Sequence, residues 1–381
     1  MNVVISVKGR FHAFYLAHQI QQRGYLNELI TTYPKFETKK YGIQSNKIKS
    51  LISHELLDRV LRKYSNKYTY NNCQFFLREI FDRHAAMKIR SDADIFVGWS
   101  SNSLHSIRRA KKNGIKTIVE RGSSHIEFQN QILSEEYGLF GLKYSGIPSE
   151  IIEKEIKEYD ESDYISVPST YVKRTFLEKN IEENKIIQIP YGVNLSNFYK
   201  VPKNDNIFRV IFCGAISLRK GVQYLLKAFH ELNLPNSELI LIGSVQKEME
   251  KILDKYKKEN IIYTGTLPEK ELYKYYSQGS VFCLPSIEEG LAMVQVQALA
   301  CGLPLICTTN TGGEDLIDDG KQGFVGPIRD VEFLKNKIVT LYEDSELTSY
   351  MADEAMRKVS QEFTWKNYGD KVIKYYMDII E

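Results

Sequence analysis

Ten short apolar runs alternate with helix-like stretches along the whole chain, and this alternation restricts the fold more than any other feature. The runs are residues 2–7, 94–98, 116–120, 164–167 and 185–189 in the first half, and 209–213, 238–242, 261–264, 281–284 and 305–308 in the second. Strands that alternate with helices usually form parallel sheets with helices on both faces. The pattern predicts an α/β protein of two doubly wound, Rossmann-like domains, whose ligands bind at the carboxyl ends of the strands.

Length and composition agree with two domains and exclude some classes of function. A chain of 381 residues is too long for one ordinary core and suits two domains of similar size. A net charge of +3 is nearly balanced, so we expect no nucleic acid partner. The five cysteines form no Cys-x-x-Cys pair, which predicts buried thiols and no metal site. No export signal is visible, and we expect a cytoplasmic protein.

The loop after residues 281–284 has the composition of a ligand site. Pro285 ends the strand, and the apolar stretch 291–301 is predicted to be a helix closed by Gly302. Backbone amides at the helix start, near Gly290 and Leu291, suit an anion. Glu289 beside them would repel a bare phosphate but can accept hydrogen bonds from hydroxyl groups. The loop therefore predicts a site for a sugar attached to a phosphate.

A second loop, residues 214–221, follows the run at 209–213 and precedes an amphipathic stretch at 222–232. It begins with Gly214 and ends with the adjacent cations Arg219 and Lys220 before Gly221. Such a pair is also typical of a solvated surface when it stands alone. Its place after a predicted strand, upstream of the Glu289 loop, favours a ligand site.

These two loops, in this order, resemble the donor-site motifs of retaining, GT-B-fold glycosyltransferases of family 4, also called group 1. The resemblance implies a catalytic role for Glu289, which would hold the hydroxyls of the transferred sugar. It also implies that Lys220, with Arg219 and Gly214, faces the diphosphate of a nucleotide sugar. Thr266, in the loop at 265–268, matches the part of the family pattern that lies around the nucleotide base.

Two positions depart from the family pattern. The family carries a second Glu eight residues after the first, where it binds the ribose, and this chain has Gln297. Glutamine keeps a carbonyl acceptor but loses the charge. The family also has an Arg just after the first Gly of the upstream loop, where this chain has Ala215. Arg219 would then supply the guanidinium from the other end of the loop.

The first half must supply the acceptor site, and two loops after predicted strands are candidates. The acceptor-side residues that we expect are Gly9 and Arg10 in one loop, and Arg121, Ser123 and His125 in the other. The family often has a histidine after a middle strand of this domain, near the transferred sugar. The resemblance therefore implies a catalytic role for His125, whereas His12 is interpreted as structural.

Residues 186–194 resemble the linker between the two domains of the family. We expect an acceptor-binding domain at residues 1–194 and a nucleotide-sugar-binding domain at 195–363. The resemblance implies that a C-terminal helix at about 364–381 packs back on the first domain.

Residues 35–67 carry nine Lys or Arg residues against Glu37, Glu55 and Asp58. Leucines and isoleucines are interspersed among them. A basic amphipathic helix of this kind can lie on an anionic membrane surface, or it can pack its apolar stripe on the first domain. Both interpretations stay open from the sequence.

The resemblance implies transfer of a hexose from a nucleotide diphosphate sugar to a hydroxyl of a glycan or lipid-linked acceptor, with retention of configuration. We expect a role in cell-surface polysaccharide or glycoconjugate synthesis, and no metal cofactor. Ala215 and Gln297 leave two alternatives, a non-catalytic nucleotide-sugar-binding partner subunit on the same fold and a glycosyl phosphorylase.

Overall fold

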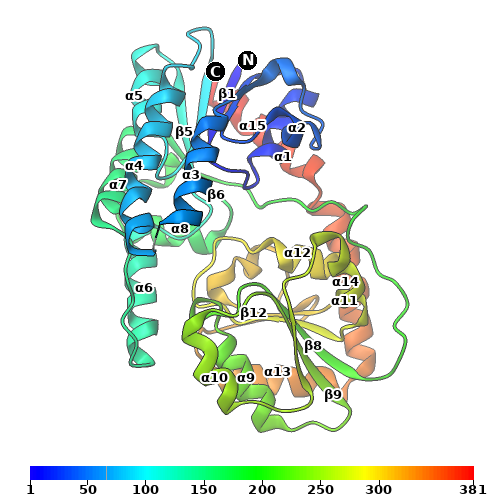
Figure 1. Ribbon diagram of the computed structural model, residues 1–381. Coiled ribbons are helices and arrows are strands. Elements are labelled where there is room, and N and C mark those ends of the chain that lie inside the picture. Colours follow the sequence, from blue (N-terminus) through cyan, green and yellow to red (C-terminus); the bar gives the residue numbers. More distant parts are fainter. Residues whose placement is uncertain (66) are drawn as a thin grey trace.

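The computed structural model describes residues 1–65 and 67–381. Its two lobes each hold a parallel sheet covered by helices (Figure 1). Within the described residues the first sheet has seven strands in the order β3-β2-β1-β4-β5-β6-β7. The strands are β1 (Val3–Val7), β2 (Leu26–Thr31), β3 (Ile48–Ser50), β4 (Ile95–Trp99), β5 (Lys116–Glu120), β6 (Tyr164–Val167) and β7 (Ile186–Gln188). The covering helices are α1 (Ala13–Gln22), α2 (Lys35–Lys39), α3 (Ile52–Tyr64), α4 (Lys67–Ala86), α5 (Leu104–Lys112), α6 (Ile126–Leu139), α7 (Ser149–Glu161) and α8 (Thr170–Leu177).

The second sheet, in the same described part of the chain, has six parallel strands in the order β10-β9-β8-β11-β12-β13. They are β8 (Phe208–Cys213), β9 (Ser237–Ile242), β10 (Ile261–Gly265), β11 (Val281–Leu284), β12 (Leu305–Thr308) and β13 (Gly323–Gly326). The helices are α9 (Val222–Leu232), α10 (Glu250–Lys255), α11 (Leu272–Gln278), α12 (Met293–Ala300), α13 (Val331–Glu343), α14 (Ser345–Glu362) and α15 (Trp365–Ile380). The predicted fold class is confirmed.

Central strands are buried along their whole length, as expected for parallel strands with helices on both faces. Every residue of β1, β4, β11 and β12 is buried. Their Val, Ile and Leu side chains form the cores of the two lobes. All five cysteines are free thiols, and four of them, Cys213, Cys283, Cys301 and Cys307, are buried as expected.

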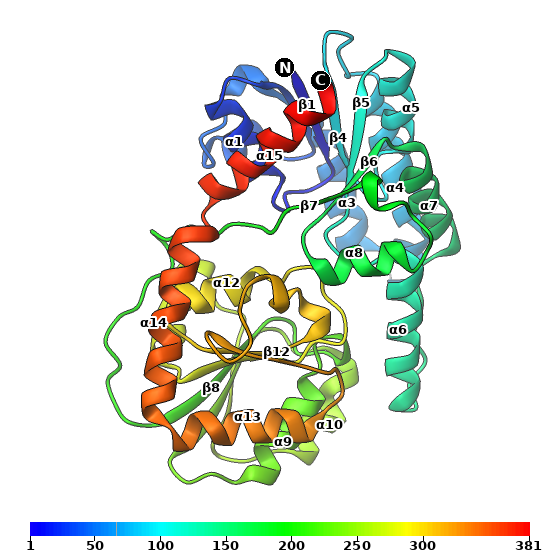
Figure 2. The same ribbon diagram turned by 180° about the vertical axis from the view of Figure 1, so that it is seen from behind.

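The chain crosses between the lobes twice, and the two crossings are joined. After β7 the chain enters the second lobe, and it returns where α14 ends and α15 begins (Figure 2). The backbone N–H of Val193 donates to the carbonyl of Phe363 over 2.7 Å, and Val193 forms a parallel bridge with Thr364. A Cβ on Gly192 would lie 2.6 Å from the backbone nitrogen of Trp365, so the crossings need glycine there.

The last helix, α15, packs on the first lobe. The ring of Trp365 stacks on Tyr15 of α1 with centroids 4.1 Å apart, and Arg23 at the end of α1 pairs with Asp370. The two chain ends therefore lie close together in this lobe (Figures 1 and 2).

Residues 35–67 do not form the single basic amphipathic helix considered above. The chain breaks into α2, a 3-10 turn at Ser45–Lys47, β3 and α3. Pairing of β3 with β2 requires an extended backbone in the middle of the segment. Asn66 lies outside the described residues.

The remaining helix of this segment, α3, is amphipathic, but it buries polar side chains and exposes apolar ones. His54 and Asp58 are buried, whereas Leu56 and Val60 are 56% and 53% exposed. Its apolar side therefore faces outward. Among the described residues, no helix is both long and apolar enough to cross a membrane.

Candidate active site between the two lobes

Loops from the carboxyl ends of both sheets meet at the boundary between the lobes. In each sheet the order reverses at one place, between β1 and β4 in the first and between β8 and β11 in the second. Ligands of doubly wound sheets bind at such positions. The loops touch closely, because a Cβ on Gly290 would lie 1.9 Å from the carbonyl oxygen of Gly122. Ser169 also donates to the carbonyl of Gly290 over 2.7 Å.

The two cations expected at the diphosphate lie beside the predicted sugar-binding carboxylate. Lys220 Nζ forms an ion pair with Glu289 Oε1, and Arg219 Nη2 lies 3.7 Å from the same oxygen. Arg219 Nε lies 3.0 Å from Glu288 Oε2. Burial opposes the charge of Arg219, but the attraction of Glu288 and Glu289 outweighs it and raises its pKa. Two cations and two carboxylates thus form one cluster across the loops after β8 and β11.

Glu288 joins this cluster to the first lobe. Its Oε1 accepts hydrogen bonds from Ser123 Oγ at 2.8 Å and Ser124 Oγ at 2.7 Å, and its Oε2 accepts from Gln129 at 2.9 Å. Burial would raise the pKa of Glu288, but Arg219 and these hydrogen bonds outweigh it and hold the pKa at about 2. The buried carboxylate is therefore ionised and fastens the two lobes together.

A second buried carboxylate, Glu136 of α6, also connects the two lobes. Figure 1 shows α6 extending from the first lobe alongside the second. Glu136 accepts hydrogen bonds from Gln223 and Tyr224 of α9, each at 2.8 Å, and pairs with Arg329 over 2.7 Å. The lobes are thus closed on each other in this structure.

The other predicted donor-side residues surround the cluster at the same edge of the second sheet. Gly214 directly follows β8, with φ +149°, and a Cβ at this position would lie 3.7 Å from Cε of Lys220. Thr266 is exposed just after β10. Gly290 and Leu291 lie in the loop before α12, which begins at Met293, two residues later than predicted.

Gln297, the glutamine in place of the family's second Glu, is buried on α12. Its side-chain oxygen Oε1 has no hydrogen-bond partner among the described residues. A buried acceptor without a donor is costly unless a ligand or water supplies one. This placement leaves the oxygen available for a hydroxyl group.

A cavity of about 1140 Å³ opens on the first-lobe side of the cluster. Its wall is built from the ends of strands and from helices: Phe11 and His12 after β1, Trp99 to Asn102 after β4, Arg121 to Ser123 after β5, and side chains of α4, α6 and α7. Arg219, Leu291 and Met293 of the second lobe complete it. Cavities of this size accept a sugar with room to spare.

The structure places His125 away from the cavity wall. Its imidazole is buried between the rings of Tyr159 and Phe176, and it caps α6 by accepting from the Glu127 N–H over 3.3 Å. Burial lowers the pKa of His125 to about 4. It is not among the residues that line the cavity, and its catalytic role stays a prediction. The histidine that lines the cavity is His12, whose Nε2 lies 3.2 Å from Glu120.

The predicted acceptor-side cations are both already engaged. Arg121 is buried, pairs with Glu155 over 2.9 Å and donates to Gln129 at 2.9 Å. Arg10 donates to the Tyr41 hydroxyl at 2.8 Å outside the cavity. Gly9 has φ +112°, which lets the loop after β1 turn into the cavity edge. Ser123 lines the cavity while holding Glu288.

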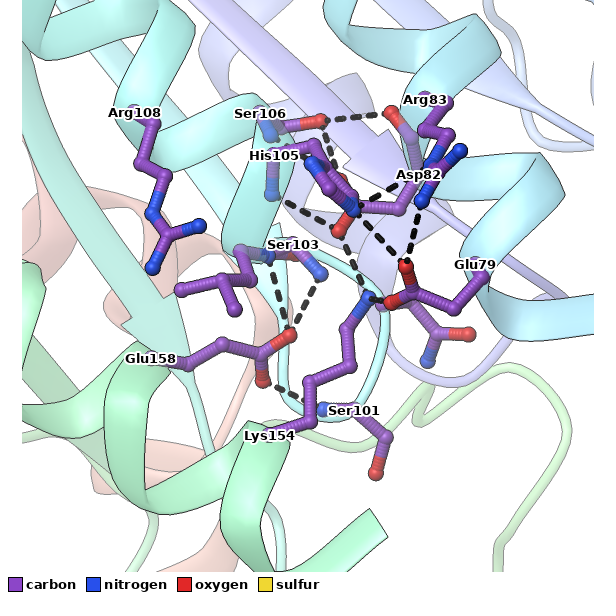
Figure 3. Close-up of polar contacts among 12 residues, drawn as sticks. Glu79, Asp82, Arg83, Ser101, Ser103, His105, Ser106, Arg108, Lys154 and Glu158 are labelled. Atoms are coloured by element: carbon purple, nitrogen blue, oxygen red, sulfur yellow. Dashed lines mark hydrogen bonds and ion pairs between the residues drawn. The ribbon is translucent and has the colours of Figure 1, made fainter. Parts of the chain in front are cut away.

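A carboxylate and imidazole cluster away from the cavity supports one of its walls (Figure 3). Glu79, Asp82 and His105 lie close enough to hold a metal ion, but Lys154 Nζ already binds Asp82 over 2.9 Å and pairs with Glu79. Beside this cluster, Glu158 accepts from the backbone N–H groups of Ser101 and Ser103 at 2.6 and 2.7 Å. The network fixes the loop after β4 that lines the cavity.

Comparison with known families finds a similarity in the second lobe. The family model for glycosyl transferases group 1 matches residues 195–358. This part of the chain is therefore similar to the glycosyl transferases of group 1. An uncharacterized glycosyltransferase of Methanocaldococcus jannaschii is 30% identical over 218 residues, 57% of this chain and 60% of the relative. A probable sucrose-phosphate synthase of Thermosipho melanesiensis is 25% identical over 295 residues, 74% of this chain and 64% of the relative. Both matches thus span less than two thirds of the relatives' length.

Solved structures show that the whole chain has the GT-B glycosyltransferase fold. Sucrose-phosphate synthase of Thermosynechococcus elongatus superposes with a TM-score of 0.74 at 16% identity, covering 100% of this chain and 99% of that one. Anabaena HepE in complex with UDP superposes with a TM-score of 0.70 at 15% identity, covering 99% and 100%. Both superpositions include the two lobes, so the first lobe shares this fold as well.

Proposed function

We propose that the chain transfers a hexose from a nucleotide diphosphate sugar to a hydroxyl acceptor with retention of configuration. The observation that carries this proposal is the cluster of Lys220, Arg219 and Glu289 beside the cavity, at the carboxyl ends of β8 and β11. The diphosphate would lie against Lys220 and Arg219, the sugar against Glu289, and the ribose against the free oxygen of Gln297. Relatives in complex with UDP support a nucleotide as ligand.

The cluster suits the charge that develops in this reaction. As the bond between the anomeric carbon and the phosphate oxygen breaks, negative charge grows on the leaving diphosphate. Lys220 and Arg219 would stabilise it from fixed positions, usually the largest contribution to such catalysis. The acceptor oxygen bonds to the same face of the anomeric carbon and passes its proton to a phosphate oxygen. We propose that these two cations make an added metal cofactor unnecessary.

The ion pair between Lys220 and Glu289 is then the donor-free arrangement of the site. A diphosphate would take over Lys220, and the released carboxylate of Glu289 would accept from sugar hydroxyls. Exchange of one anion for another keeps the partly buried Lys220 paired, so the donor enters without leaving an unpaired charge.

We further propose that the acceptor is a glycan or a lipid-linked glycan used in cell-surface polysaccharide or glycoconjugate synthesis at the inner face of a membrane. The outward apolar side of α3 supports this proposal, because Leu56 and Val60 are flanked by Arg59, Arg62 and Lys63. Arg59 and Arg62 pair with carboxylates of their own helix, which leaves Lys63 as the cation most available to anionic lipid.

The decisive experiment mixes the protein with nucleotide sugars and acceptor candidates and measures release of free nucleoside diphosphate. A thermal-shift panel first identifies the donor, since a ligand at a hundredfold its dissociation constant stabilises by about 2.7 kcal/mol. If the protein transfers the sugar, free nucleoside diphosphate and a longer acceptor should form, and they should also form when a chelator removes metal ions. Binding without release would instead identify a non-catalytic partner subunit, and release of sugar phosphate on adding phosphate would identify a phosphorylase.

A further inference from the structure

The cavity of the first lobe contains four buried polar atoms that no described residue satisfies. They are Arg78 Nε, Gln74 Nε2, Asn102 Oδ1 and the hydroxyl of Tyr191, and all four residues line the cavity. Buried polar groups in folded proteins almost always have a hydrogen-bond partner. Four exceptions on the wall of one cavity indicate that a polar ligand completes it.

Arg78 is the most costly of the four, because its charge is unpaired. Its guanidinium forms neither a hydrogen bond nor an ion pair within the described residues. The carboxylates that attract it from a distance, Glu155, Glu158 and Asp58, are committed elsewhere, Asp58 to Arg62 and Tyr70. Glu155 binds Arg121, and Glu158 holds backbone N–H groups of the loop after β4. Burial lowers the pKa of Arg78 despite that attraction.

Gln74 stands one helical turn before Arg78 on α4, so both side chains leave the same face of the helix. Together they offer an amide donor and a planar guanidinium, the combination that binds phosphate or carboxylate oxygens. Asn102 Oδ1 offers an acceptor for a hydroxyl group. Phe11 and Phe75 supply apolar surface to the same cavity. These cavity side chains are suited to bind a sugar that carries an acidic group rather than a neutral sugar.

We propose that this cavity binds the acceptor through an anionic group, a phosphate or a carboxylate, held by Arg78 and Gln74. The proposal rests on the proposed transfer reaction only in naming the ligand as the acceptor. It also replaces the two cations expected from the sequence, since Arg121 is taken by Glu155 and Arg10 lies outside the cavity.

The test compares three probes by calorimetry: glucose 6-phosphate, glucuronate and methyl glucoside. The wild-type protein should bind the phosphate or the carboxylate probe at least tenfold more tightly than the neutral one, and the two acidic arms identify which group the site prefers. Arg78→Gln should remove this tenfold preference, and Arg78→Lys should keep part of it. Arg10→Gln removes the same charge outside the cavity and should change nothing.

Two further variants separate the alternatives. Lys220→Ala should leave the preference intact, and its loss there would place the anion on the donor side and overturn the proposal. Arg78→Gln should unfold at the same or a higher temperature than the wild type, because an unpaired buried charge is removed. A clear fall would mean a structural role and also overturn it, as would a wild type with no anion preference. Donor binding is measured separately, so failure of the transfer reaction is distinguishable.

Discussion

Glu289 and Gln297 stand eight residues apart and should affect different parts of one donor. Glu289→Gln should lower turnover while leaving affinity for the free nucleoside diphosphate nearly unchanged, since that ligand has no sugar to lose. Gln297→Ala should raise the Michaelis constant with little change in turnover, because the ribose contact is equal in ground and transition states. Calorimetry with the nucleoside diphosphate checks both. The reverse pattern would place the donor differently along this loop.

Lys220 gives the simplest kinetic prediction at the level of one residue. Lys220→Ala should reduce turnover by on the order of a hundredfold or more, as loss of a key charge-stabilising group does. Lys227→Ala is the matched control, because Lys227 is a half-exposed lysine on α9 whose ion-pair partner Glu231 lies 3.9 Å away. Steady-state rates with one nucleotide sugar decide it. Equal rates for the two variants would remove Lys220 from the site.

Single residues were predictable where the chain itself places them after a strand. Lys220 and Glu289 lie in the loops that follow β8 and β11, so their loop position could be inferred. Arg78 and Glu288 could not. Arg78 lies within a long helix that only tertiary packing brings to the cavity. Glu288 precedes Glu289, and the sequence does not tell which neighbour turns to the other lobe.

Among the elements, α3 should determine membrane contact. Replacing Leu56 and Val60 by Gln should weaken binding to anionic vesicles by roughly thirtyfold, because each replacement loses roughly 1 kcal/mol of apolar burial. Stability should hardly change, because both side chains are more than half exposed. Tyr350→Gln is the control, an equally exposed apolar residue on α14. Vesicle sedimentation checks the result, and equal binding by all variants would contradict membrane contact through α3.

Most elements were predictable, and the missed strands share a physical cause. β2, β3 and β13 were not expected. β2 contains Asn27 and Glu28, and the buried Glu28 is tolerated because Lys49 of β3 pairs with it over 3.4 Å. β3 has three residues, and β13 begins and ends with glycine. Such strands are specified by their neighbours in the sheet rather than by their own hydrophobic pattern.

At the scale of the whole molecule, the ionised Glu288 makes the stability of the closed protein depend on pH. Its folded pKa of about 2 lies below the ordinary value of 4.5, so its contribution to stability is complete above pH 4.5 and is lost as the pH falls toward 2. The contribution is on the order of 3 kcal/mol. The stability difference between wild type and Glu288→Gln should therefore narrow over that range in denaturant titrations.

A matched control uses a contact between the two lobes that lies nearer the surface, the ion pair of Arg174 and Glu314 at 2.8 Å. Glu314→Gln should change stability by less than about 1 kcal/mol, because the pair is partly exposed. A Glu288→Gln difference that stays constant from pH 7 to pH 3 would refute the ionised contact.

The joined crossings at Val193 and Thr364 have a mechanical consequence. Two lobes joined by a single segment can twist and tilt in any direction, but two segments bonded side by side act as a hinge. We expect relative motion of the lobes to be reduced to one rotation about that hinge. Glu288 and Glu136 bond the lobes away from these crossings in the sequence, so opening about the hinge would break their contacts. Substrate entry and product release would accordingly share one path, which distance measurements between the lobes would follow as a single variable.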